Sequence, residues 1–185
     1  MKRKKIYFPC TNRVHLARQK LLLKELKRYF DLQIAEYEFN DKNISGDMAW
    51  KADAITSFFN DDIRRATPDL LLARGDRFEI LPAVMLCAYK GIPIAHIEGG
   101  DMSSVTDNRV RHAITHLSDF HFCTNEESHV RLINMGIPMN RIWNFGSLDV
   151  EFASLYGGER IVKEKYIFVH FHPIGGENEN EFGEA

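Results

Sequence analysis

The sequence predicts an α/β protein with a doubly wound, mostly parallel sheet. Short apolar runs alternate with longer segments of helical periodicity along the 185 residues. Two of these runs, 70–73 and 94–97, are almost wholly apolar, as strands covered on both faces of a parallel sheet are. Each is followed closely by glycine and acidic residues, in a position where open parallel sheets bind their ligands.

The remaining elements follow the same alternation. Strands are expected over residues 6–9, 32–37, 70–73, 94–97, 120–123 and 142–145. Helices are expected over residues 16–30, 47–60, 80–89, 109–117 and 126–135, from apolar residues at helical spacing. Thr124 and Asn125 are candidate N-caps of the last of these helices. Repeated βα units of this kind imply right-handed crossovers.

The pattern breaks at Tyr156-Gly157-Gly158-Glu159, after which a further strand is expected over residues 166–171. One strand and a single helical turn cannot bury a core. They either pack on the first domain or begin a second domain that this chain does not contain. We favour the second interpretation, with residues 1–156 as an N-terminal domain. Residues 157–185 are then the opening strand and helix start of a truncated C-terminal domain.

Composition limits the classes of function. The chain is 44% hydrophobic and 27% charged, with a net charge of −2, which disfavours bulk electrostatic binding of nucleic acid. The basic run at residues 2–5 is interpreted as a solvated lead-in to the first strand. The three cysteines lack zinc or CxxC spacing, and no apolar run approaches the roughly 20 residues of a membrane span. We expect a cytoplasmic protein with no membrane partner.

The first candidate site residues follow the apolar strands. Asp76 and Arg77 lie between the strand at 70–73 and a helix, where a helix N-terminus and a guanidinium stabilise phosphate. Asp76 is a candidate acid or base, and the alternative is a helix cap. Glu98 is expected to project into the same crevice beside two glycines. His96, on the same strand, fits a hydrogen-bonded core residue better than a catalyst.

Further candidates lie near the starts of other elements. Asp107 and Arg111 are four apart at the opening of a helix, so they share a face either as an ion pair or toward a ligand. His112 and His116 have a spacing that can hold zinc, but no third ligand is evident, and we expect no metal. Arg13 follows the first strand, in a turn without a GxGxxG fingerprint.

Several segments resemble the UDP-N-acetylglucosamine 2-epimerase family, in particular its hydrolysing branch that feeds sialic-acid synthesis. The segments are NRVH, PDLLLARGDRFE, IPIAHIEGGD, DNRVRHAITHLSDFHFCTNEE, RLINMGI, WNFGSLD and FHP, in that order along nearly the whole chain. The resemblance implies one half of a two-domain, glycosyltransferase-B-like architecture, with Rossmann-like domains facing across a cleft. It also implies that the truncated C-terminal domain begun by residues 157–185 is nucleotide-binding. It implies no cofactor, a UDP-sugar substrate and a homodimer at full length.

The resemblance also implies an activity and residue roles. The reaction would be hydrolysis of UDP-N-acetylglucosamine with inversion at C2, by anti elimination of UDP and addition of water. Matching positions put Asp76, Glu98, Asp107 and Arg111 in the catalytic group. Arg13, Arg77, His112 and His172 would contact the substrate, chiefly at its nucleotide. The isolated chain is expected to turn over poorly, because domain closure completes such a site.

Departures from the family pattern leave alternatives open. His15, Ala17 and Leu148 stand where the family commonly has an acid, a small polar residue and proline. These changes indicate a modified sugar, such as a diacetamido-trideoxyhexose, or a different nucleotide, UDP or GDP. A non-catalytic module that binds nucleotide sugars is the alternative from another class. A glycosyltransferase on the same architecture would need an acceptor, and fold analogy alone does not exclude it.

Overall fold

A computed structural model describes residues 2–11, 13–37, 48–103, 105–156, 158 and 162–167. Within them lies a single six-stranded sheet in which every neighbouring pair of strands is parallel. The strands are β1 (Lys5–Cys10), β2 (Asp31–Glu36), β3 (Leu70–Arg74), β4 (Ile94–Ile97), β5 (Phe120–Cys123) and β6 (Ile142–Asn144). Their order is β2-β1-β3-β4-β5-β6, which confirms the doubly wound α/β class.

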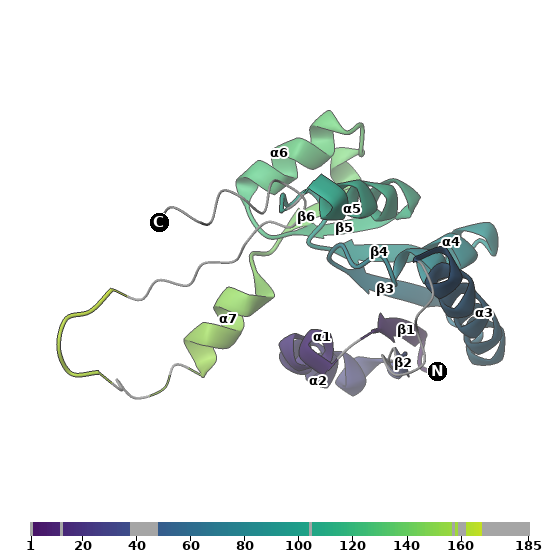
Figure 1. Cartoon of the computed structure of the whole chain (residues 1–185), viewed down its shortest axis with the longest axis horizontal. Helices are drawn as coiled ribbons and strands as arrows, with labels where there is room; N and C mark the ends of the chain where they lie inside the picture. The colour runs from purple at the N-terminus through teal and green to yellow at the C-terminus, as the bar shows by residue number, and fades with distance from the viewer. Residues whose placement is uncertain are drawn as a thin grey trace.

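Helices connect consecutive strands (Figure 1). They are α1 (Arg13–Arg18), α2 (Lys20–Tyr29), α3 (Met48–Ala66), α4 (Leu81–Tyr89), α5 (Val105–Leu117), α6 (Glu126–Asn134) and α7 (Leu148–Leu155), with a 3₁₀ turn at Met139–Arg141. Four expected helices are confirmed as helices: those over 47–60, 80–89, 109–117 and 126–135. Two of them, α3 and α5, are longer than expected. The helix expected over 16–30 is interrupted at Gln19, and α7 was not expected.

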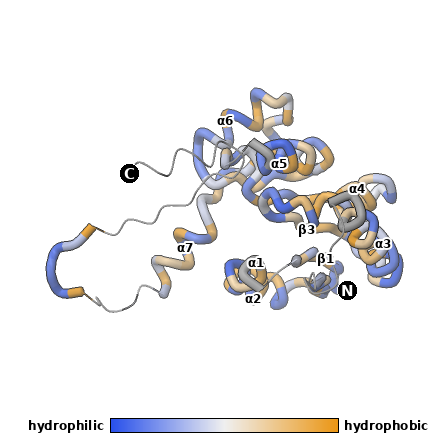
Figure 2. The backbone as a smooth tube through the Cα atoms, in the orientation of Figure 1, coloured by the Kyte–Doolittle hydropathy of each residue, from blue (hydrophilic) through white to orange (hydrophobic). Residues whose placement is uncertain are grey.

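The helices cover two faces of the sheet, and the strand residues alternate between them. Tyr7, Leu71 and Ile94 pack with residues of α3, α4 and α5 in one apolar cluster. Phe8, Leu72 and their neighbours pack with α1, α2 and Leu148 in another. Figure 2 shows hydrophobic and hydrophilic residues alternating along the tube of α3, one of the helices that lie against the sheet. This period of two along each strand is what lets one sheet carry two separate cores.

Local sequence explains where several elements begin. Asn125 caps α6 by accepting a hydrogen bond from the Ser128 backbone N–H at 2.8 Å, so one of the two expected caps is confirmed. Pro82 lies in the first turn of α4, where no intrahelical N–H is needed. All three cysteines are buried and free.

The expected strand over 166–171 is only partly covered by the described residues. Tyr166 and Ile167 are described and lie in no strand, and residues 168–171 are outside the described ranges. The division of the chain into a domain at 1–156 and the start of another at 157–185 remains a prediction. No helix in the described part of the chain is long and apolar enough to cross a membrane.

The strand order identifies the edge of the sheet at which a ligand is expected. From β1 the chain moves first to β2 on one side and then to β3 on the other, so the direction of winding reverses between β1 and β3. Ligands of open α/β sheets bind outside the carboxyl ends of the strands at such a reversal. The turns after β3 and β4 lie at this edge and carry Asp76, Arg77 and Glu98, and Arg13 begins α1 after β1.

Candidate functional site

Glu98 begins the loop after β4 in a backbone conformation that few non-glycine residues adopt. Its φ is +68°, in the left-handed region, and the two following residues are glycines. Residues held in this region cluster at functional sites, where the surrounding structure outweighs the strain. The side chain is half-buried, and its Oε2 lies 3.3 Å from the position that a Cβ on Gly75 would occupy. Glu98 therefore reaches the turn after the neighbouring strand β3.

Arg74, the last residue of β3, pairs with Glu98 at the carboxyl end of the two neighbouring strands. Its Nε donates to Glu98 Oε1 at 2.6 Å, and Nη2 forms an ion pair with the same oxygen. Nη2 also lies 3.2 Å from Asp149 Oδ1 on α7; it makes ion pairs in this site but no well-aligned hydrogen bond. Nη1 donates to the Arg18 carbonyl at 3.2 Å. A guanidinium that is 1% exposed is thus held on three sides.

Arg18 and Asp149 close the cluster from α1 and α7. Arg18 donates from Nε to Asp149 Oδ1 at 3.2 Å, and its Nη2 pairs with the other oxygen. That hydrogen bond with Arg18 is the main cause that lowers the pKa of Asp149, and Arg74 adds to it. The same bond raises the pKa of Arg18, with smaller contributions from Glu98 and Asp76. Both candidate carboxylates therefore lie within the electrostatic reach of one arginine.

Asp76 pairs with Arg111 across the turn after β3. Asp76 Oδ2 accepts hydrogen bonds from Arg111 Nη2 and from Ser103 Oγ, the second at 3.1 Å. Arg111 Nη1 also donates to the Asp101 carbonyl at 2.7 Å and to Asn108 at 3.2 Å. Arg111 is almost completely buried, so this aspartate, like Glu98, faces a guanidinium that the fold fixes in place.

Asp101 fixes the loop between β4 and α5 to the adjacent elements. Its Oδ1 accepts hydrogen bonds from Thr124 and Ser128, each at 2.6 Å. The Gly100 carbonyl accepts a further bond from Arg131 on α6. The loop that follows Glu98 is therefore held against α6 and the turn before it, which limits how far Glu98 can move.

The other predicted residues lie at varying distances from this cluster. Asp107 is exposed in the first turn of α5, one turn before Arg111. Arg77 pairs with the buried Glu79, with Nε–Oε2 at 3.1 Å and Nη2–Oε1 at 2.5 Å. Arg13 begins α1, at the carboxyl end of β1, and the position of its side chain is not described. His172 lies outside the described residues.

His112 follows Arg111 on α5 and is half-buried. Its Nε2 is enclosed and has no hydrogen-bond partner among the described residues. Burial, and then the charge of Arg111, lowers the pKa of His112. The imidazole is therefore neutral near pH 7 and keeps a polar atom available inside the fold.

Two more histidines, His96 on β4 and His121 on β5, lie side by side in the sheet interior. His96 Nε2 is 2.9 Å from the Gly75 carbonyl and Nδ1 is 3.2 Å from Thr115 Oγ1. Among the described residues, neither ring nitrogen of His121 has a well-formed hydrogen bond, although the Ser118 backbone lies close enough to oppose the pKa shift. Burial lowers the pKa of His96 to about 3 and that of His121 to about 4. His96 acts as a core residue that supports the Gly75 turn.

These two shifts predict loss of stability in mild acid. In the unfolded chain both histidines titrate near their ordinary pKa of 6.5, while the folded protein keeps them neutral. Stability is therefore complete above pH 6.5 and falls as the pH drops toward the lowered values, by on the order of 2 kcal/mol for each histidine at about pH 5. Urea unfolding across this range measures the effect. His121→Gln should flatten the pH dependence, and an unchanged slope would contradict this origin.

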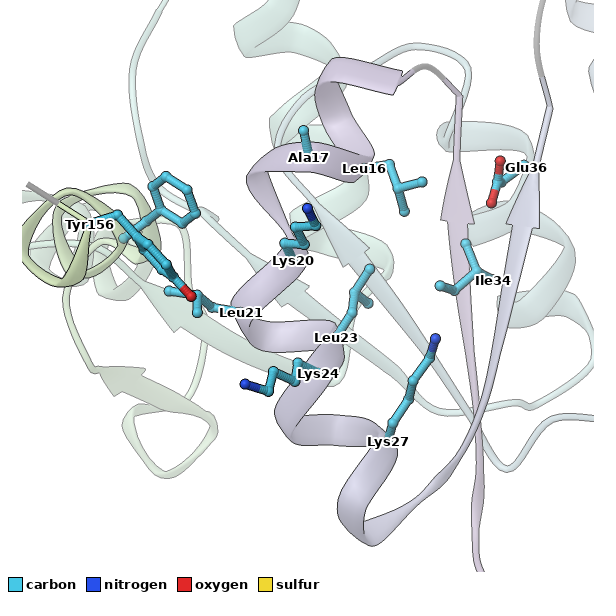
Figure 3. A pocket seen from close by; sticks show the side chains of 11 residues that line it. Leu16, Ala17, Lys20, Leu21, Leu23, Lys24, Lys27, Ile34, Glu36 and Tyr156 are labelled. Carbon is cyan, nitrogen blue, oxygen red and sulfur yellow. The ribbon is translucent and has the colours of Figure 1, made fainter. Parts of the chain in front are cut away.

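No group of three or more histidine, cysteine, aspartate or glutamate side chains that could hold a metal ion occurs among the described residues. A separate groove of about 970 Å³ lies along α2, on the α7 side of the sheet. Figure 3 shows Lys20, Lys24 and Lys27 around it, with Tyr156 opposite. None of the predicted carboxylates lines this groove. The groove is therefore separate from the cluster of acidic and arginine side chains described above.

Three members of the cluster were missed from the sequence: Arg18, Arg74 and Asp149. A charged residue at the end of an otherwise apolar strand was a usable signal for Arg74, because burying an arginine requires a partner. Arg18 and Asp149 gave no such signal. They are 131 positions apart, and their partnership depends on α7.

The chain is thus a doubly wound parallel α/β domain with two carboxylates and buried arginines at the carboxyl edge, where sheets of this class bind their ligands. The chain belongs to the UDP-N-acetylglucosamine 2-epimerase family, whose model matches residues 11–184. The resemblance predicted from the sequence is thereby confirmed.

Three curated relatives indicate how the family varies. The chain is 40% identical over 89 residues to the UDP-N,N'-diacetylbacillosamine 2-epimerase (hydrolyzing) of Legionella pneumophila, covering 48% of this chain and 24% of that protein. It is 35% identical over 116 residues to a UDP-N-acetylglucosamine 2-epimerase of Neisseria meningitidis serogroup B, covering 58% and 31%. A GDP/UDP-N,N'-diacetylbacillosamine 2-epimerase (hydrolyzing) of Campylobacter jejuni is 31% identical, covering 69% and 34%. The chain thus spans a quarter to a third of the length of these relatives.

Solved structures share the fold. A UDP-N-acetylglucosamine 2-epimerase from Rickettsia bellii superposes with a TM-score of 0.75 at 18% identity, over 84% of this chain and 48% of that chain. The UDP-GlcNAc 2-epimerase from Neisseria meningitidis, solved with UDP-GlcNAc bound, gives 0.72 at 19% identity, over 82% and 49%. At these identities the likeness concerns the fold, and it places this chain on about half of each structure.

Proposed function

We propose that the protein at its natural full length is a hydrolysing epimerase of an N-acetylated sugar nucleotide, with UDP-N-acetylglucosamine as the first candidate. The observation that carries the proposal is the pair of carboxylates, Asp76 and Glu98, at adjacent strand ends. Each is held by a buried arginine, Arg111 or Arg74. A reaction that removes a proton from a sugar carbon and later returns one needs groups of this kind.

The proposed chemistry has two steps. A carboxylate removes the proton on C2 while the C1–O bond to UDP breaks, so that a glycal and UDP form. Water then adds across the double bond, with a proton going to C2 from the opposite face and hydroxide to C1. Asp76, Glu98 and Asp107 are the proposed acid/base groups, and Arg111 lies beside them. Arg13, Arg77, His112 and His172 are proposed to contact the substrate, in part by stabilising the leaving diphosphate.

A second candidate substrate is supported by the relatives. The matches from Legionella pneumophila and Campylobacter jejuni are both named as hydrolysing epimerases of diacetylbacillosamine nucleotides. Leu148, where the family commonly has proline, lies next to Asp149, so the departure falls beside the cluster. A UDP- or GDP-linked diacetamido sugar is therefore the alternative to UDP-N-acetylglucosamine.

The test uses full-length protein with each sugar nucleotide in heavy water and in oxygen-18-labelled water. A hydrolysing epimerase should release the nucleoside diphosphate and a free manno-configured sugar, with deuterium at C2 and oxygen-18 at C1. A product that remains linked to UDP and lacks oxygen-18 would show the non-hydrolysing reaction instead. Tight binding without turnover of any tested substrate would favour the non-catalytic binding module.

A further inference from the structure

The buried guanidinium of Arg74 was assigned no part in the proton transfers proposed above. Arginine is rarely enclosed unless its charge is paired, because taking the ion out of water costs several kcal/mol. Here the pairing is divided among Glu98, Asp149 and the Arg18 carbonyl, which come from the loop after β4, from α7 and from α1. Three separate elements therefore fix the position of one guanidinium.

The two oxygens of Glu98 are in different environments. Oε1 accepts from Arg74 at Nε and also pairs with Nη2. Oε2 is directed at the Gly75 turn, and among the described residues it makes no hydrogen bond. The Glu98 side chain is 14% exposed, so it lies at the solvent edge of the site. Arg74 thus holds one oxygen and leaves the other available.

The backbone alone does not orient this carboxylate. The left-handed φ of +68° and the anchored loop fix where the side chain starts, but a glutamate has three rotatable bonds beyond Cα. The planar fork of Arg74 removes that freedom, since Nε and Nη2 approach the same oxygen while Nη2 also faces Asp149.

We propose that Arg74 is a positioning residue for the reaction. It fixes the Glu98 carboxylate through Oε1 so that Oε2 is presented to the substrate. This inference rests on the proposed function, in which Glu98 exchanges a proton with the sugar. Asp149 supports it from α7 by holding the guanidinium on its other side.

The test compares wild type, Arg74→Met and Arg74→Lys at full length, with Arg64→Met, an exposed arginine of α3, as the matched control. With the sugar nucleotide that the wild type turns over, Arg74→Met should lower kcat about 100-fold and leave KM within about threefold. Arg74→Lys restores the charge without the fork and should recover only part of the loss. Arg64→Met should behave like wild type. Melting temperature and substrate-binding stoichiometry report the folded fraction of each variant.

Crystal structures of the same proteins give a readout that does not depend on turnover. In Arg74→Met the Glu98 side chain should leave the Gly75 turn or occupy several conformations, and the backbone of the loop should be unchanged. A well-folded Arg74→Met that keeps wild-type kcat, or whose Glu98 stays in place, would overturn the inference. If wild type turns over no sugar nucleotide, the proposed function fails and the crystal structures decide the positioning role. If Arg74→Met does not fold, the kcat and the crystal structure of Arg74→Lys decide whether Arg74 positions Glu98.

Discussion

Glu98→Gln in the full-length protein should lower kcat by about 10²–10⁴-fold, the usual range for loss of a general acid or base. The substitution keeps the shape of the side chain and removes its negative charge. Arg74 still retains Asp149 as a charged partner, so the fold should tolerate the change better than it would tolerate loss of the arginine. Initial rates of UDP release, with substrate affinity measured separately, give the result.

Glu127→Gln is the matched control for this substitution. Glu127 is exposed at the start of α6, outside the Glu98 and Asp76 cluster, and the same change of charge there should leave turnover as it was. If Glu98→Gln keeps more than about a tenth of the wild-type rate, Glu98 does not transfer the proton and Asp76 becomes the leading candidate.

Gly100→Ala should destabilise the protein by roughly 2–5 kcal/mol, the largest effect on folding that we expect from adding one methyl group. Gly100 has φ +84°, and a Cβ there would lie 2.5 Å from the Ser128 carbonyl oxygen and 3.0 Å from Leu132 Cγ. The carbonyl is backbone and cannot rotate away. The loop would have to separate from α6, and the hydrogen bonds of Asp101 to Thr124 and Ser128 would be disturbed.

Gly136→Ala separates the two causes of this effect. Gly136 has nearly the same φ, +86°, and no other atom of the described residues lies within 4 Å of the position that its Cβ would take, so only the backbone strain of about 1–2 kcal/mol remains. Urea unfolding of both variants measures the difference. Equal losses at the two positions would mean that the contact with Ser128 relaxes at little cost.

The sequence predicted the sheet well because each strand is a short apolar run with a recognisable end. Residues 70–73 and 94–97 are buried on both sides and lie within two or three residues of an acid, so their strands and the positions of Asp76 and Glu98 followed directly. The helix α7 was missed because its exposed apolar residues, among them Val150, Phe152 and Leu155, show no amphipathic pattern.

Partnerships within the site were harder to predict than the residues themselves. Asp107 and Arg111 were expected to pair or to act together because they are four apart. In the structure Arg111 donates hydrogen bonds to Asp76, to Asn108 and to the Asp101 carbonyl. Asp76 is 35 positions away, and such a contact depends on the order of strands, which spacing along the chain does not reveal. Arg77, beside Asp76 in the sequence, pairs with Glu79.

The contact of α7 with the cluster also limits where this protein can be recombined with its relatives. Asp149 lies beyond the last strand, yet it completes the charge balance around Arg18 and Arg74. In a chimera joined at Ser147, Arg18 and Arg74 would come from this protein and the residue at position 149 from the relative. The ion pairs between them would then form only if the relative also has an acid at that position. Joining after Tyr156 would keep Arg18, Arg74, Glu98 and Asp149 together from one parent.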